Sequence, residues 1–180
     1  MSTSNNINIE SLIHTDLQQY LLSHGMIDEP LPKAPDIEEQ WQTICESYLP
    51  DGMREFNAYP TVSLGWMMFV GMAIAKCWDT DWQQYSKMPD LYKYLRDQRD
   101  FDHMDEYICE QVLQLTADGH TTINNIVAEC ASRTYNLLCH QILEPGTPAA
   151  FRGYVAALHQ MYLMGMAMEL KRLGYHMCKM

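Results

Sequence analysis

The chain has 180 residues, of which 47% are apolar, and its acidic residues outnumber the basic ones by 23 to 12, for a net charge of −11. This length suits one domain with a substantial hydrophobic core, and the apolar content excludes a disordered chain. An acidic surface repels phosphate backbones and anionic lipids, and no basic stretch counters it, so we expect neither nucleic-acid nor membrane binding.

Helical spacing of apolar residues predicts an all-α fold: a compact bundle of six to seven helices in one domain, residues 1–180. Residues 9–24 and 36–49 form the first two predicted helices. The proline-rich residues 28–35 connect them, and a second break at residues 50–52 is the expected end of the second helix. No segment alternates polar and apolar residues over the length of a strand.

The third predicted helix begins at Pro60 and contains the most apolar stretch of the chain, Leu64–Ala75, which has no polar side chain. A helix that is apolar on every side must be buried on every side, so we predict that it is the central core helix. Residues 79–81 leave two alternatives open, because the helix could continue through Tyr85 or stop there and restart.

Four further helices are predicted in the second half of the chain. Their expected spans are 89–95, 103–117, 122–143 and 148–173. Asp102 and Thr121 are the expected N-caps of the second and third of these helices, because their side chains can accept a hydrogen bond from the first helical turn.

The two halves of the chain resemble each other when one is shifted by 94 residues (165 − 71). The aligned pairs include Gly25 with Gly119, Gly52 with Gly146, and Gly71 with Gly165. One interpretation is an internal repeat of residues 1–86 and 95–180, each a three-helix unit related by pseudo-twofold symmetry. The other is coincidence between methionine-rich helices. In a repeat, the two apolar helices would pack near the centre, where glycines would let their backbones approach closely.

The six cysteines are scattered, without a C-x-x-C pair, which indicates free thiols in a reducing compartment. The N-terminal residues 1–10 lack the basic and apolar regions of a signal peptide. The longest apolar runs are shorter than the ~20 residues that a spanning helix needs. We therefore expect a cytoplasmic location.

No motif of a familiar catalytic or cofactor site is present. The sequence has no P-loop, no G-x-G-x-x-G, no G-x-S-x-G, no H-E-x-x-H and no Glu-x-x-His pair. The densest group of metal-ligand side chains, residues 102–106, falls at a predicted helix start, where acidic residues also belong electrostatically. We therefore expect no resident cofactor or metal, and a metal-dependent enzyme is the weakest of three hypotheses.

Fourteen methionines indicate either a plastic core or a deformable apolar pocket. His159 interrupts the apolar residues 154–168, where a buried imidazole needs a hydrogen bond. Two interpretations stay open: a hydrogen-bonded core or boundary histidine, or the polar anchor of an apolar ligand pocket lined by Trp66, His159 and Tyr162.

Trp78, Trp82 and Tyr85 follow one helical stripe at i, i+4 and i+7 with acidic neighbours. Such aromatic stripes are typical of partner surfaces, but they can equally cap the core end of a long helix. The leading hypothesis is a non-enzymatic protein that acts through contacts with another protein or in a homo-oligomer. The alternative is a binder of a small apolar ligand in a methionine-rich core pocket.

Overall fold

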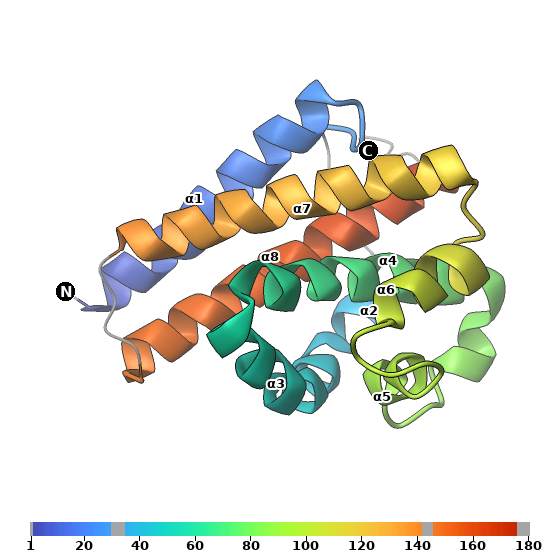
Figure 1. Cartoon of the computed structure of the whole chain (residues 1–180), viewed down its shortest axis with the longest axis horizontal. Coiled ribbons are helices and arrows are strands. Elements are labelled where there is room, and N and C mark those ends of the chain that lie inside the picture. The colour runs from blue at the N-terminus through green and yellow to red at the C-terminus, as the bar shows by residue number, and fades with distance from the viewer. Residues whose placement is uncertain (1, 30–34, 142–145, 176–180) are drawn as a thin grey trace.

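The chain folds as a bundle of helices, which we describe from a computed structural model over residues 2–29, 35–141 and 146–175 (Figure 1). This described part contains no strand, so the all-α prediction is confirmed. The elements are α1 (Ser2–Ser23), α2 (Pro35–Glu38), α3 (Trp41–Ala58), α4 (Pro60–Tyr85), α5 (Leu91–Arg96), α6 (Met104–Tyr107), the π-helical turn η1 (Ile108–Val112), α7 (Ala117–His140) and α8 (Pro148–Arg172).

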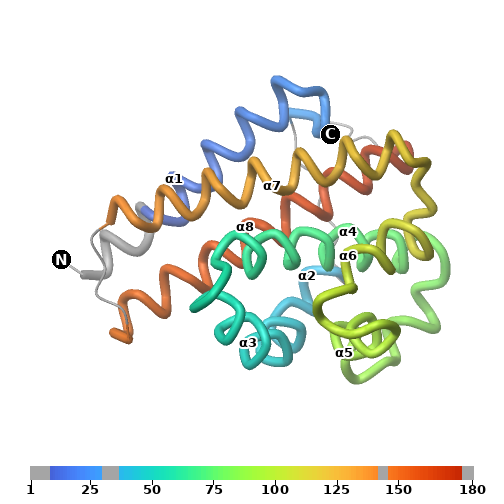
Figure 2. Tube along the Cα trace, in the orientation of Figure 1, coloured from blue at the N-terminus to red at the C-terminus, as the bar shows by residue number. Residues whose placement is uncertain are grey.

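Helices α4 and α8 pack against each other at the centre of the bundle. Helices α1 and α7 lie together on one side of this pair, and α3 and α5 lie on the other side, as the trace in Figure 2 shows. Every residue of Leu64–Ala75 is buried except Trp66, which is partly buried. The prediction that this stretch forms the central core helix is therefore confirmed.

Two glycines allow α4 and α8 to meet backbone to backbone. A Cβ atom added at Gly71 would overlap the carbonyl oxygen of Tyr162, and one added at Gly165 would overlap the carbonyl oxygen of Met68. Real Cβ atoms essentially never come so close to a backbone oxygen. The predicted close approach of the two apolar helices at these glycines is therefore present in the structure.

This contact is reciprocal under the 94-residue shift, because Gly165 follows Gly71 by 94 positions and Tyr162 follows Met68 by 94 (162 − 68). Other aligned landmarks do not correspond in structure. Gly25 ends α1 with a φ of 69°, whereas Gly119 lies in the first turn of α7. The internal repeat therefore stays a prediction.

The second predicted helix differs from the structure at both ends. A separate turn, α2, precedes α3, and α3 continues through Pro50 to Ala58 instead of ending at the proline. Proline inside a helix removes one backbone hydrogen bond. Contacts with α5 support the helix past this point, because Asp51 Oδ2 accepts hydrogen bonds from Tyr92 at 2.7 Å and Arg96 at 3.0 Å.

The region predicted as one helix over residues 103–117 is divided in the structure. It consists of α6, the π-helical turn η1 and a turn in which Gln114 has a φ of 54°. The expected cap Asp102 is wrong, because Asp100 Oδ1 accepts the hydrogen bond from the His103 amide at 3.0 Å. A π-helical turn rotates the apolar face of the residues that follow it. A sequence pattern that assumes one regular helical spacing of apolar residues therefore misses it.

The predicted start of the following helix is also wrong. Thr116, and not Thr121, caps α7, because its hydroxyl accepts a hydrogen bond from the Gly119 amide at 3.0 Å. Helix α1 likewise begins at Ser2, earlier than the predicted residue 9. Most of the proline-rich connector, residues 30–34, lies outside the described residues.

Helix α4 runs to Tyr85, with one non-helical residue at Asp81 (φ −164°, ψ 77°), so both alternatives at residues 79–81 are partly met. By length and composition, α4 is also the one described helix that could cross a membrane, although the lengths of the apolar runs predict no such span. In this structure, 72% of its most apolar window is buried inside the bundle, as in a core helix, so the support for a span is weak.

We predict that Gly71→Ala and Gly165→Ala each lower the free energy of unfolding by about 3 kcal/mol or more, because the added methyl group meets a backbone that cannot move aside cheaply. Urea denaturation followed by circular dichroism measures this. Gly65→Ala is the matched control in the same helix. Its Cβ would meet the Val127 side chain at 3.1 Å, so we expect a change within about 1 kcal/mol.

The double variant gives a sharper test of the same contact. Once the first alanine has forced the helices apart, the second should cost less, so the two effects should be less than additive. Fully additive losses, or a loss for Gly71→Ala no larger than that of Gly65→Ala, would contradict the backbone contact.

Candidate ligand-binding site

The three residues predicted to line one apolar pocket lie in two places. His159 and Tyr162 both pack against Trp41, with ring centres 5.0 and 5.1 Å from that of the indole. Trp66 is not part of this group, and its indole N–H donates to the Phe101 carbonyl at 2.8 Å. The structure therefore brings together two of the three residues and places the third elsewhere.

A chain of hydrogen bonds joins His159 on α8 to helix α1. His159 Nδ1 lies 2.8 Å from Glu10 Oε1, which also accepts from Gln160 Nε2 at 3.0 Å. The Gln160 amide oxygen lies 2.9 Å from His14 Nδ1. His159 is thus a hydrogen-bonded boundary histidine, and it also lines a shallow cavity of about 350 Å³ beside Trp41.

The three aromatic residues predicted as a partner surface are partly buried. Trp78, Trp82 and Tyr85 all pack against the core. Trp78 lies 5.2 Å from the ring centre of Tyr175, and Tyr85 lies 6.2 Å from that of Tyr94. Their use as a surface for a protein partner stays a prediction.

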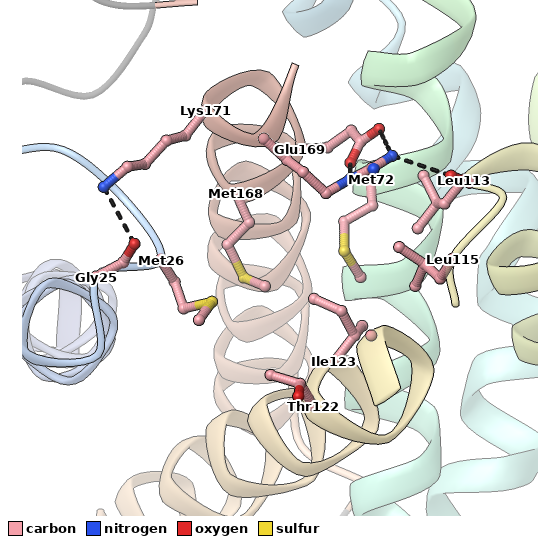
Figure 3. Close-up of a pocket in the computed structure, with 12 residues that line it drawn as sticks. Gly25, Met26, Met72, Leu113, Leu115, Thr122, Ile123, Met168, Glu169 and Lys171 are labelled. Carbon is pink, nitrogen blue, oxygen red and sulfur yellow. Dashed lines mark hydrogen bonds and ion pairs between the residues drawn. The ribbon is translucent and has the colours of Figure 1, made fainter. Parts of the chain in front are cut away.

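A second cavity, of about 380 Å³, lies between the end of α8 and the start of α7 (Figure 3). We call it the methionine pocket. Five parts of the chain form it: the turn after α1, the middle of α4, the turn before α7, the first turns of α7 and the last turns of α8. Its lining residues are Gly25, Met26, Met72, Leu113, Leu115, Gly119, Thr122, Ile123, Met168, Glu169, Lys171 and Arg172.

The walls of the methionine pocket are mostly apolar. Met26, Met72 and Met168 extend their thioether groups toward the space between the helices, and Ile123 and Leu115 line it from the side of α7 (Figure 3). Methionine is unbranched and has three rotatable bonds, so it adapts its shape to a neighbour. These walls can therefore fit apolar molecules of different outlines.

One edge of the pocket is charged. Glu169 is only 1% exposed, and its two carboxylate oxygens accept hydrogen bonds from Arg172 at 2.5 and 2.8 Å. Arg172 also donates to the Leu113 carbonyl at 3.1 Å, and Lys171 donates to the Gly25 carbonyl at 3.1 Å. The cations thereby tie the end of α8 to the two turns that close the pocket.

Burial raises the pKa of the Glu169 carboxyl above its ordinary value, and the bonds from Arg172 offset this only in part. A carboxyl whose pKa is higher in the folded state than in the unfolded state favours folding at low pH. That contribution is lost as the pH rises from the unfolded pKa through the folded one. Burying the Glu169 carboxylate therefore lowers the stability of the fold at neutral pH, and Arg172 offsets part of this loss.

The sequence predicts a methionine-rich pocket but places it at Trp66, His159 and Tyr162, none of which lines this cavity. Two signals in the sequence point to the residues that do line it. Met72 belongs to Leu64–Ala75, the most apolar stretch of the chain. Glu169 is an acidic residue directly after an apolar run, with Arg172 three positions later on the same helical face. The sequence alone does not show that the turns carrying Met26 and Leu113 close over these residues.

Among the described residues, no three His, Cys, Asp or Glu side chains lie together closely enough to hold a metal ion. The five described cysteines are free thiols, and four of them are buried. Burial raises the pKa of Cys77, Cys109 and Cys130 to about 12. These thiols therefore stay protonated at neutral pH, in which state they are poor nucleophiles.

Comparison with known proteins gives no match: no family model, no curated protein and no solved structure is significantly similar to the chain. The geometry of the molecule is therefore the guide to its function.

We predict that Arg172→Met destabilises the protein by about 3 kcal/mol at pH 7, because it leaves the buried Glu169 charge without its partner. The loss should shrink as the pH falls toward 4, since Glu169 then becomes protonated and no longer needs the arginine. Urea denaturation at a series of pH values measures both effects. Lys171→Met is the control, because Lys171 pairs with Asp28 at 3.2 Å in a partly exposed position and not with Glu169, so we expect a loss of less than about 1 kcal/mol at pH 7. A pH-independent loss for Arg172→Met would contradict the role given to Glu169.

Proposed function

We propose that this protein binds a small apolar molecule in the methionine pocket. The observation that carries the proposal is a cavity of about 380 Å³ with methionine, leucine and isoleucine walls, inside a bundle whose central helices otherwise touch backbone to backbone. Most ligand pockets have volumes of about 300–1,000 Å³ and predominantly apolar linings, so this cavity suits a ligand at the small end of that range.

The arrangement of the walls supports binding of a ligand with one polar end. The apolar walls would take up its body, and methionine sulfur makes favourable contacts with the edges of aromatic rings. The Glu169–Arg172 pair and Lys171 form the charged edge. A hydroxyl group on the ligand could exchange hydrogen bonds there without placing an unpaired charge in the core.

The test uses protein labelled with ¹³C in its methionine methyl groups, titrated with 1-naphthol. We predict saturable shifts of the Met26, Met72 and Met168 signals, with a dissociation constant on the order of 10 µM, which corresponds to about −7 kcal/mol. Thr122→Trp should fill the pocket from its exposed edge and weaken binding at least tenfold.

Thr121→Trp is the matched control, because Thr121 is also exposed, at the neighbouring position of α7, and does not line the pocket. It should bind 1-naphthol as the unmodified protein does. Shifts spread over methionines far from the pocket, or equal binding by both tryptophan variants, would overturn the proposal.

A second candidate function is contact with another protein or with a second copy of this chain. Met53 and Phe151 support it, because they are 45% and 42% exposed and line one shallow cavity of about 300 Å³ with Phe56 and Tyr154. Large apolar side chains that gather on a surface often mark an interface.

Light scattering after size-exclusion chromatography tests this candidate. We predict a dimer or larger assembly for the unmodified chain, and a monomer for the double variant Met53→Glu with Phe151→Glu, because charges at these exposed positions cannot be buried in an interface. Leu12→Glu is the control, since Leu12 is 47% exposed on α1 and does not line this cavity. A monomeric unmodified chain would remove self-association and leave only a different partner.

A further inference from the structure

The shallow cavity beside His159 is separate from the methionine pocket and has the features of a second ligand site. Its floor is one face of α8, with Arg152 at one end, Val155 and Ala156 in the middle and His159 at the other end. The two polar ends are seven positions apart in the sequence, which places them about 10 Å apart along the helix axis at 1.5 Å per residue. Trp41 adds an aromatic wall.

Arg152 differs from every other arginine of the chain. Five of the six arginines form an ion pair with a carboxylate: Arg54, Arg96, Arg99, Arg133 and Arg172. Arg152 has no such partner among the residues that the structure describes, although the protein carries an excess of acidic groups. A planar guanidinium with free donors pairs best with a carboxylate, which it can hold through two parallel hydrogen bonds.

The other end of the cavity presents a hydrogen-bond acceptor. Glu10 holds His159 at Nδ1, so the neutral ring carries its proton there and has a free lone pair on Nε2. Gln160 fixes the same carboxylate oxygen from inside the protein, since it is only 5% exposed and donates to Glu10 at 3.0 Å. Its amide oxygen points toward His14, and a reversed amide would set two acceptors against each other.

The charge of Glu10 also limits what can bind at this end. Glu10 lines the cavity with His159, and its carboxylate would repel a second anion. A hydroxyl group, in contrast, can donate to Nε2 without such repulsion. Between the two ends, the flat ring of Trp41 and the Phe151 side chain favour an aromatic body.

We propose that this cavity binds a small aromatic carboxylate, with the carboxylate on Arg152, the ring beside Trp41 and Phe151, and a hydroxyl group at the far end donating to His159 Nε2. The proposal does not depend on the methionine pocket, because the two cavities share no lining residue.

The first test is a titration with 4-hydroxybenzoate, followed in nitrogen-correlated NMR spectra by the signals of the Arg152 and Trp41 side chains and the His159 ring. Benzoate lacks the hydroxyl group and 4-hydroxybenzamide lacks the charge, so each should bind at least tenfold more weakly. Equal binding of 4-hydroxybenzoate and 4-hydroxybenzamide would overturn the proposal. So would shifts confined to the methionine pocket.

Two variants test which end of the ligand binds to Arg152 and which to His159. Arg152→Gln should weaken 4-hydroxybenzoate binding at least tenfold and leave 4-hydroxybenzamide binding unchanged. The fold should tolerate this change, because Arg152 is exposed and pairs with no carboxylate of the described residues. His159→Asn can still donate to Glu10 but lacks Nε2, so it should reduce 4-hydroxybenzoate binding to the level of benzoate. Arg54→Gln is the control, since it removes an exposed arginine from a different cavity and should not change binding.

The tautomer of His159 can be measured without any ligand. Long-range proton–nitrogen NMR spectra at a pH where the ring is neutral should show the proton on Nδ1, whereas free histidine carries it mainly on Nε2. A proton on Nε2 would remove the acceptor from the cavity and overturn the proposal, even if 4-hydroxybenzoate binds.

Discussion

The contact of Gly71 on α4 with α8, and of Gly165 on α8 with α4, determines how the rest of the bundle is arranged. Each glycine lies against a carbonyl oxygen of the opposite helix, so a methyl group at either position would separate them. Two helices this close bury each other on one face only. Their remaining apolar faces need cover, which α1, α7 and α3 supply, and this explains why a helix apolar on all sides can sit in a chain with a net charge of −11.

Close approach at one point also explains the cavities elsewhere. Helices that touch at a crossing diverge on either side of it, and the space between them must be filled by longer side chains. On the side of Met72 and Met168, methionines and two covering turns fill it incompletely and leave about 380 Å³. Backbone atoms meet at the crossing, whereas the pocket walls include methionine side chains, which have three rotatable bonds. The proposed ligand would therefore displace side chains of the pocket walls and leave the contact between α4 and α8 in place.

Local signals predict the fold class and the central helix, because burial and helical period are properties of neighbouring residues. The close approach of the two apolar helices follows only from comparing the two halves of the chain. Local signals fail where a distant contact decides the outcome. Pro50 predicts the end of α3, whereas the helix continues and is supported past the proline by the hydrogen bonds of Asp51 with Tyr92 and Arg96. The candidate sites show the same limit: His159 was recognised, but its partner Glu10 lies 149 positions away and its aromatic neighbour Trp41 on a third helix.

The polar residues of α8 still offer a way to find such sites. In a helix that is largely buried, each polar group costs free energy unless another group bonds with it, so every polar interruption needs a partner. His159 and Gln160 find theirs on α1, and Glu169 finds its partner in Arg172. Arg152, at the exposed start of the helix, has none among the described residues. The polar residues that interrupt α8 thus line both cavities. One cavity contains the buried Glu169–Arg172 pair, and the other contains an arginine without a carboxylate partner in the described part of the chain.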